Sequence, residues 1–134
     1  MRDAPRRTIG WLIYVVVAHL VISVVHGIAH TRANVPLSPA ASLFVLVVIL
    51  AGPIIGLATM WASVRAGSWL VAITMVGALV FGVLNHFVFA SADHVAHVDP
   101  QWQPLFATTA VLLAFMEGLG TVLALTLVQA EQLT

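Results

Sequence analysis

Six histidines stand out in a chain of 134 residues that is 61% hydrophobic and only 7% charged. Histidine titrates near neutral pH and is the commonest metal ligand, so histidines grouped within an apolar chain indicate a ligand site or a proton path. His19, His26 and His30 are separated by seven and four positions, which places them within about 40° of one another on a helix. We therefore expect these three side chains to form one stripe.

A second polar stripe is expected near the end of the third apolar segment. If that helix continues to its last histidine, then His86, Asp93 and His97 repeat the separations of seven and four positions, and His94 lies to one side. Polar side chains of membrane helices turn inward, because lipid cannot hydrogen-bond them. The two stripes are therefore expected to face each other inside a helical bundle.

The two facing stripes predict a metal site near the outer ends of their helices. Its four predicted ligands form two pairs with the i, i+4 spacing of adjacent helical positions: His26, His30, Asp93 and His97. Three imidazoles and one carboxylate suit zinc, iron, manganese or copper, and without sulfur ligands these metals are not distinguished. We expect His86 and His94 to be additional ligands or to orient the ligands through hydrogen bonds.

An alternative interpretation of the same histidines is a haem b site. Two imidazoles on facing helices can hold a haem iron from opposite sides, and the candidate pairs are His19 with His86 or His26 with His86. Two haems on the same pair of helices would crowd His26 and Asp93 between the macrocycles. The spacing therefore favours one haem over two.

One carboxyl group is predicted to lie within the membrane. Glu117 is near the middle of the fourth apolar segment, where an ionisable side chain needs a partner. His19 is the candidate partner at the nearest depth. A pair formed by Glu117 and His19 would begin a proton or cation path that leads outward along the histidine stripe.

Four apolar runs must position these side chains. They cover approximately residues 9–29, 41–62, 68–92 and 105–128, and each reaches the ~20 residues that a ~30 Å hydrocarbon core requires. The connections are short, which makes successive helices antiparallel neighbours. The sequence therefore predicts an all-α fold, an integral membrane four-helix bundle with up-down-up-down topology that forms a single domain over residues 1–134.

The arginines are distributed unevenly around these runs. One side of the predicted membrane receives four of them: Arg2, Arg6, Arg7 and Arg65. The two connections on the other side hold only Arg32. By the positive-inside rule, both termini of this multi-pass protein are cytoplasmic, and the connections around residues 30–40 and 91–104 lie outside the cell membrane.

Two segments of the chain resemble each other. Residues 19–30 and 86–97 have equal length and share four identities: His19/His86, Val21/Val88, Ala29/Ala96 and His30/His97. The offset is half the length of the chain. This similarity predicts an internal repeat in which residues 1–67 and 68–134 are duplicated helical hairpins.

Composition excludes several classes of function. The chain has no cysteine, which excludes disulfides, thiolate metal sites and covalent haem attachment. Its net charge is zero, which argues against a nucleic-acid surface, and it contains no glycine-rich phosphate loop of the kind that binds nucleotides.

The remaining patterns indicate a histidine-rich, metal-binding membrane protein that acts in redox chemistry or metal handling. The first alternative is a haem b cytochrome or quinone-linked electron carrier. The others are a noncatalytic accessory subunit of a larger membrane complex and a small transporter, which would need a homodimer because four helices enclose little lumen. Whether the chain is an enzyme is left open by these patterns.

Overall fold

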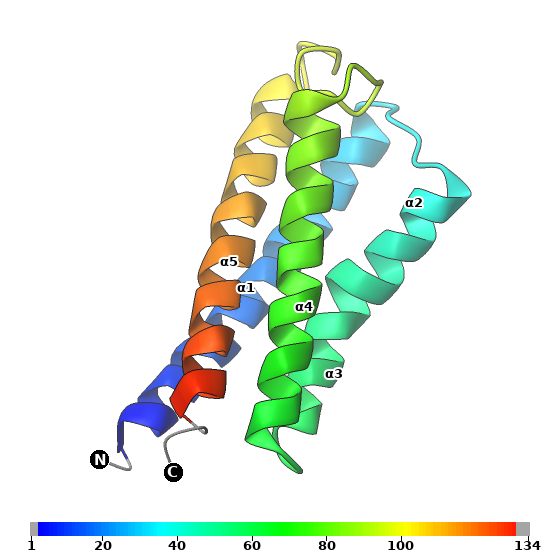
Figure 1. The fold of residues 1–134 in the computed structure, drawn as a ribbon. Helices are drawn as coiled ribbons and strands as arrows, with labels where there is room; N and C mark the ends of the chain where they lie inside the picture. The colour runs from blue at the N-terminus through cyan, green and yellow to red at the C-terminus, as the bar shows by residue number, and fades with distance from the viewer. Residues whose placement is uncertain (1–2, 131–134) are drawn as a thin grey trace.

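The computed structural model describes residues 3–130, and over that range the chain consists of helices and the loops that join them. Four helices are long and apolar enough to cross a membrane: Arg6–Arg32, Pro39–Thr59, Val64–Val88 and Gln103–Ala130. Figure 1 shows them running alternately up and down, with the start of the first and the end of the last at the same end of the bundle. The predicted all-α four-helix membrane bundle is confirmed.

Seven helical elements make up these four spans in the described range. The first span is α1 (Asp3–Arg32) and the fourth is α5 (Gln103–Ala130). The second consists of α2 (Pro39–Phe44), the π-helical η1 (Val45–Ala51) and α3 (Gly52–Thr59), and the third of α4 (Val64–Val83) and the π-helical η2 (Leu84–Val88). The single domain predicted over residues 1–134 also covers 1–2 and 131–134, which lie outside the described residues.

Capping residues account for where the second and third spans begin. The Ser38 hydroxyl accepts a hydrogen bond from the Ala41 backbone N–H at 3.1 Å, and Pro39 occupies the first turn, where a helix has no use for its N–H. Ser63 caps α4 in the same way and accepts a bond from the Ala66 N–H at 3.2 Å. These caps determine where α2 and α4 begin.

α5 packs against both α1 and α4, and the second span packs on α4. One apolar cluster fills the end of the bundle where α1 begins and includes Leu12, Val16, Met75 and Leu127. A second cluster lies at the other end, beside residues 33–38 and 89–102, and includes Ala29, Val35, Val98 and Phe106. We call this second end the loop end.

α3 and α4 approach each other closely at Gly56 and Gly67. A Cβ atom added to Gly67 would lie 2.6 Å from the Gly56 carbonyl oxygen and 2.5 Å from the Met60 backbone nitrogen. One turn away, a Cβ atom on Gly52 would overlap the Thr74 side chain. Small residues at this face allow the two backbones to touch, as is common between membrane helices.

We expect Gly67→Ala to destabilise the protein by about 1–3 kcal/mol, because a methyl group there must displace backbone atoms of α3. Gly118→Ala is the matched control, since a Cβ atom at Gly118 meets nothing within 4 Å and alanine favours a helix. Thermal unfolding of both variants in one detergent measures the difference. Equal stability would contradict the close contact of α3 and α4.

The third span ends at Val88 rather than at residue 92, where the sequence placed its end. After η2 the backbone becomes extended at Phe89. The Ser91 hydroxyl then accepts a hydrogen bond from the Asp93 N–H at 3.2 Å, a local bond that competes with helix formation. Residues 89–102 form a loop that folds back, so that the Val95 N–H donates to the carbonyl oxygen of His86 at 2.9 Å.

This loop changes the expected geometry of the second stripe. Residues 19–30 are helical throughout, whereas residues 89–97 are not. Asp93 and His97 therefore do not share a helical face with His86, and the separations of seven and four positions do not determine where they lie. The internal repeat stays a prediction from the sequence alone.

Candidate metal centre

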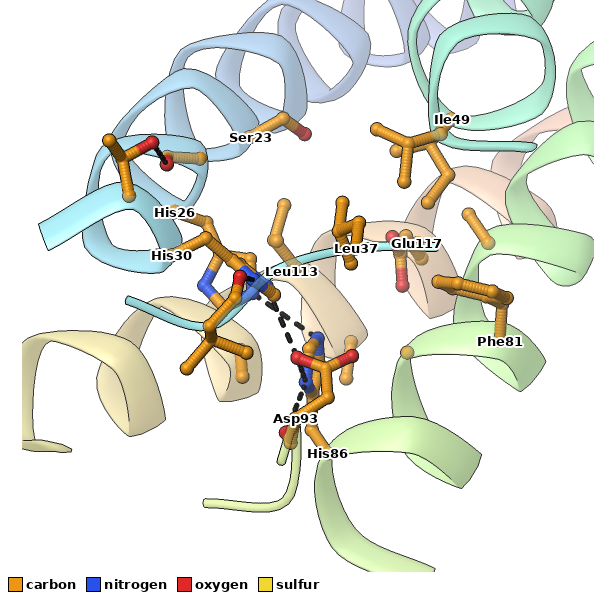
Figure 2. Close-up of a pocket in the computed structure, with 18 of the residues that line it drawn as sticks. Ser23, His26, His30, Leu37, Ile49, Phe81, His86, Asp93, Leu113 and Glu117 are labelled. Carbon is orange, nitrogen blue, oxygen red and sulfur yellow. Dashed lines mark hydrogen bonds and ion pairs between the residues drawn. The ribbon is translucent and has the colours of Figure 1, made fainter. Parts of the chain in front are cut away.

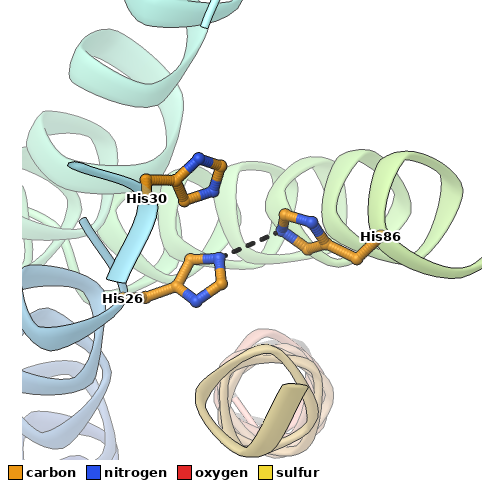
Figure 3. Close-up of side chains that lie close together, drawn as sticks. All are labelled: His26, His30 and His86. Carbon is orange, nitrogen blue, oxygen red and sulfur yellow. Dashed lines mark hydrogen bonds between the residues drawn. The ribbon is translucent and has the colours of Figure 1, made fainter. Parts of the chain in front are cut away.

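Three histidines from two spans converge at the loop end of the bundle. His26 and His30 lie in α1 and His86 lies in η2, and one ring nitrogen from each falls within 4.8 Å of the other two. The Nε2 atoms of His26 and His86 are 3.2 Å apart. Figure 3 shows the three rings turned toward one another. We call this group the histidine triad.

The triad is withdrawn from the surface of the chain. His26 and His86 are buried, and the side chain of His30 is 11% exposed. His86 sits on a π-helical turn, a local widening of the helix that is frequent at functional sites.

Backbone carbonyl groups hold two of the imidazoles in one orientation. Nδ1 of His86 lies 3.1 Å from the Asp93 carbonyl oxygen, and Nδ1 of His30 lies 3.4 Å from the Val35 carbonyl oxygen. A carbonyl oxygen only accepts hydrogen bonds, so both Nδ1 atoms carry a proton and donate it. In the neutral imidazole the lone pair is then on Nε2.

A hydroxyl group on α5 does the same for the third imidazole. Nδ1 of His26 lies 2.7 Å from the Thr109 hydroxyl oxygen, which in turn lies 2.7 Å from the Leu105 carbonyl oxygen. Because the hydroxyl donates its only hydrogen to Leu105, it accepts from His26. The lone pair of neutral His26 is therefore also on Nε2.

These three orientations make the centre of the triad attractive to a cation. The Nε2 lone pairs of His26 and His86 face each other at 3.2 Å, and they repel unless a proton or a metal ion lies between them. Two nitrogens bound to one tetrahedral zinc ion are separated by about 3.4 Å, given the usual Zn–N distance of ~2.1 Å. The observed separation fits that arrangement.

Asp93 places a carboxylate beside the triad. Its Oδ1 atom is 3.3 Å from Nε2 of His30 and 3.3 Å from Nδ1 of His86, and among the described residues this buried oxygen has ion-pair contacts but no hydrogen bond. Burial by itself would raise the pKa of Asp93, but its contact with Nδ1 of His86 outweighs burial and holds that pKa below its ordinary value. The group is therefore a carboxylate at neutral pH.

Phe106 of α5 closes the triad from one side. Its ring is fully buried, and its centroid lies 4.7 Å from those of His26 and His30 and 5.1 Å from that of His86. An aromatic wall against all three imidazoles excludes water and strengthens electrostatic interactions at their nitrogens.

A cavity of about 490 Å³ adjoins the triad and extends into the bundle. α1, η1, α4 and α5 all contribute side chains to its walls, and Glu117 lies among them (Figure 2). The cavity therefore joins the triad to the buried carboxyl group.

Glu117 forms a separate pair with His19, as the sequence suggests. Oε1 of Glu117 is 3.3 Å from Nε2 of His19, and both side chains are buried. His19 precedes His26 by seven residues in α1, so this pair lies about 10 Å deeper than the triad. The other ring nitrogen of His19, Nδ1, has no hydrogen-bond partner in the described part of the chain.

The structure groups the predicted ligands differently from the sequence. His26 and His30 lie in the triad with His86, for which an additional or orienting role was expected, and Asp93 lies beside them. His97 is exposed and donates from Nδ1 to the Ser91 carbonyl oxygen at 2.7 Å. Its ring packs on His94, with centroids 5.2 Å apart. The cause is the end of η2 at Val88, after which the chain turns instead of continuing as a helix.

Sequence reasoning missed Thr109 and Phe106, the two α5 residues that contact the triad. A signal for both was present, because positions 106, 109, 113 and 117 recur at helical spacing and share the face that carries Glu117. A hydroxyl residue two turns from a buried carboxyl group on that face is a candidate partner for a histidine.

His26 and His86, one of the pairs predicted to bind haem b, have their Nε2 atoms at a distance that suits a single small ion. Ligands on opposite sides of a haem iron stand about 4 Å apart, twice a metal–nitrogen distance of ~2 Å, with the macrocycle between them. The two Nε2 atoms are closer than that. His19, the other candidate haem ligand, is paired with Glu117.

No model of a known protein family matches the chain, and comparisons with curated proteins and with solved structures gave no match either. The triad, the cavity and the membrane spans are therefore the features that bear on the function of the chain.

Proposed function

We propose that this multi-pass membrane protein binds one divalent transition metal ion at His26, His30 and His86 and acts in redox chemistry or metal handling. One observation carries the proposal. All three imidazoles direct Nδ1 toward an oxygen acceptor, and one ring nitrogen of each lies within 4.8 Å of the other two, with Nε2 of His26 and Nε2 of His86 3.2 Å apart. Hydrogen bonds from the outer ring nitrogen to carbonyl or hydroxyl oxygens are typical of metal-bound histidines.

The donor atoms suit zinc, iron, manganese or copper. Three imidazole ligands leave at least one coordination position open, which is typical of catalytic and transport sites rather than structural ones. Asp93 lies beside this open position, because its Oδ1 atom is 3.3 Å from Nε2 of His30. A carboxylate also balances part of the charge of a divalent ion that lies in an apolar surrounding.

The proposed topology has both ends of the chain in the cytoplasm and the loop end outside. The arginines near the start of α1 and α4 support it: Arg6, Arg7 and Arg65. Arg2, which belongs to the same pattern, lies outside the described residues. With this orientation the metal ion reaches the triad from the periplasm or the extracellular space.

Metal analysis of the purified protein tests the proposal. We expect about one ion per chain after mild purification, or after titration of the metal-free protein with Zn²⁺ or Co²⁺. The visible spectrum of bound Co²⁺ then reports the coordination geometry. A protein that carries no metal and takes up none on titration would contradict the proposal.

Thr109→Val is expected to weaken metal affinity about 10- to 100-fold without changing the number of ions bound, because His26 loses the acceptor that fixes its orientation. Valine has nearly the same shape as threonine, so packing is conserved. Thr109→Ser keeps the hydroxyl group and is expected to keep most of the affinity. Competition with a chelator of known affinity measures the metal affinity of both variants. An unchanged affinity in Thr109→Val would show that the hydroxyl group does not support metal binding.

A further inference from the structure

The cavity beside the triad lies where the first and second spans separate. α1 packs on α5 and touches the second span at α3, whereas η1 packs on α4. Between α1 and η1, Ser23 and Gly27 line the cavity from one side and Val45 and Ile49 from the other. In Figure 1 the part of the second span nearest the loop end diverges from the rest of the bundle. The cavity therefore occupies a gap between two membrane spans, and residues 34–37 of the connection between these spans also line it.

The size and lining of this cavity suit an organic molecule. About 490 Å³ falls within the ~300–1,000 Å³ range of pockets for small molecules. Ile49, Phe81 and Leu113, from three different helices, contribute apolar side chains to its wall. Its polar lining includes the triad, Asp93, Glu117 and Ser23.

The charges of the lining select a neutral molecule. Asp93 and Glu117 are the ionisable side chains beside the histidines, and the cavity lining contains no lysine or arginine in the described range. A phosphate or carboxylate head group would therefore meet two carboxyl groups and no cationic side chain, and the proposed metal ion, whose charge Asp93 partly balances, would be the one cation to attract it. A hydroxyl or carbonyl oxygen carries no such penalty.

We propose that the cavity binds a neutral lipid-soluble molecule, with a hydroxyl or carbonyl oxygen against the histidine triad and an apolar body between Ile49, Phe81 and Leu113. The molecule enters from the membrane between α1 and η1. The head-group contact rests on the proposed function, since a metal ion held by three imidazoles has a position open to an exogenous oxygen.

Two sources share this chemistry: isoprenoid-like quinones or quinols, and long-chain alcohols derived from lipid. Two probes distinguish them, a short-tailed benzoquinone and a fatty alcohol of matched length, each carrying a diazirine in the tail. The metal-loaded protein is placed in phosphatidylcholine nanodiscs and irradiated with each probe. Mass spectrometry then identifies the labelled residues, with and without excess unlabelled compound.

We expect saturable labelling at Ile49, Phe81 and Leu113 by one of the probes, which identifies the source. Ala114→Phe fills the cavity from α5 and is expected to reduce this labelling about 10-fold. Val111→Phe, on the lipid-exposed face of the same helix, is the control and is expected to leave it unchanged.

Labelling that is spread over lipid-facing residues, does not saturate, or is equal in Ala114→Phe and the control would overturn the inference. Metal content and thermal stability of each variant are measured in parallel, to establish that Ala114→Phe is folded and metal-loaded. If metal binds but labelling is unspecific, only the cavity assignment fails. If labelling is specific in a protein that never binds metal, the proposed metal function fails and the cavity remains.

Discussion

His86→Ala is expected to lower the affinity for zinc by about 100- to 1,000-fold, so that the protein no longer retains one ion per chain on purification. A full set of ligands supplies ~10–16 kcal/mol, and the loss of one imidazole removes roughly 3–4 kcal/mol of it. The effect is large because His86 is the sole ligand from the third span and lies 3.2 Å from His26. Isothermal titration of the purified variant with Zn²⁺ measures the change.

The matched control for this experiment is His97→Ala. His97 is exposed and bonded to the Ser91 carbonyl oxygen, outside the triad, so its loss is expected to leave the affinity within a few-fold of the parent. Comparable losses in both variants would show that histidine content, rather than the triad, determines uptake. A His86→Ala protein that still carries one ion per chain would show that His86 is not a ligand.

Glu117→Leu is expected to destabilise the bundle by about 2–5 kcal/mol, because it leaves His19 without its partner in the apolar interior. The two side chains come from α1 and α5, so their contact also fixes how these helices align. Unfolding of the variant in mixed detergent micelles, followed by circular dichroism, measures the change in stability.

The double variant His19→Leu, Glu117→Leu distinguishes two contributions to the free energy of unfolding: the penalty of an unpaired buried group and the stabilisation that the pair itself provides. Replacing both partners by apolar residues removes the desolvation penalty, so we expect it to recover most of the lost stability. Glu117→Gln keeps a hydrogen-bonding group and is expected to fall between the parent and Glu117→Leu. A Glu117→Leu protein as stable as the parent would mean that the contact of His19 with Glu117 contributes nothing to the fold.

The positions of the spans are predictable from the sequence because they depend only on the hydropathy and length of each segment. A run of about 20 apolar residues must be helical in lipid, since every backbone group has to be hydrogen-bonded within the segment. The pairing of His26 with His30 follows for the same reason, because helical periodicity places residues i and i+4 together.

The rest of the site depends on contacts between distant segments. Asp93 and His97 seemed to continue a helical stripe, but the bond between Ser91 and the Asp93 N–H begins a turn that periodicity does not reveal. The partnership of His26 with Thr109 depends on how α5 is rotated about its axis, which is set by packing with α1 and α4. The helical spacing of Thr109 and Glu117 indicates that Thr109 faces inward, but it does not indicate which residue of α1 it meets.

Within the described range, the second span lines the cavity but supplies none of the groups that hold the triad. The groups that hold the triad come from α1, η2, α5 and the two loops, whereas η1 supplies a wall of the cavity. α3 is fixed to α4 by the contact of Gly56 with Gly67, far from the metal ligands. Residues such as Val45 and Ile49 can therefore change during evolution without disturbing the ligands. Related chains would be able to keep the proposed metal site and diverge in the lining of the cavity beside it.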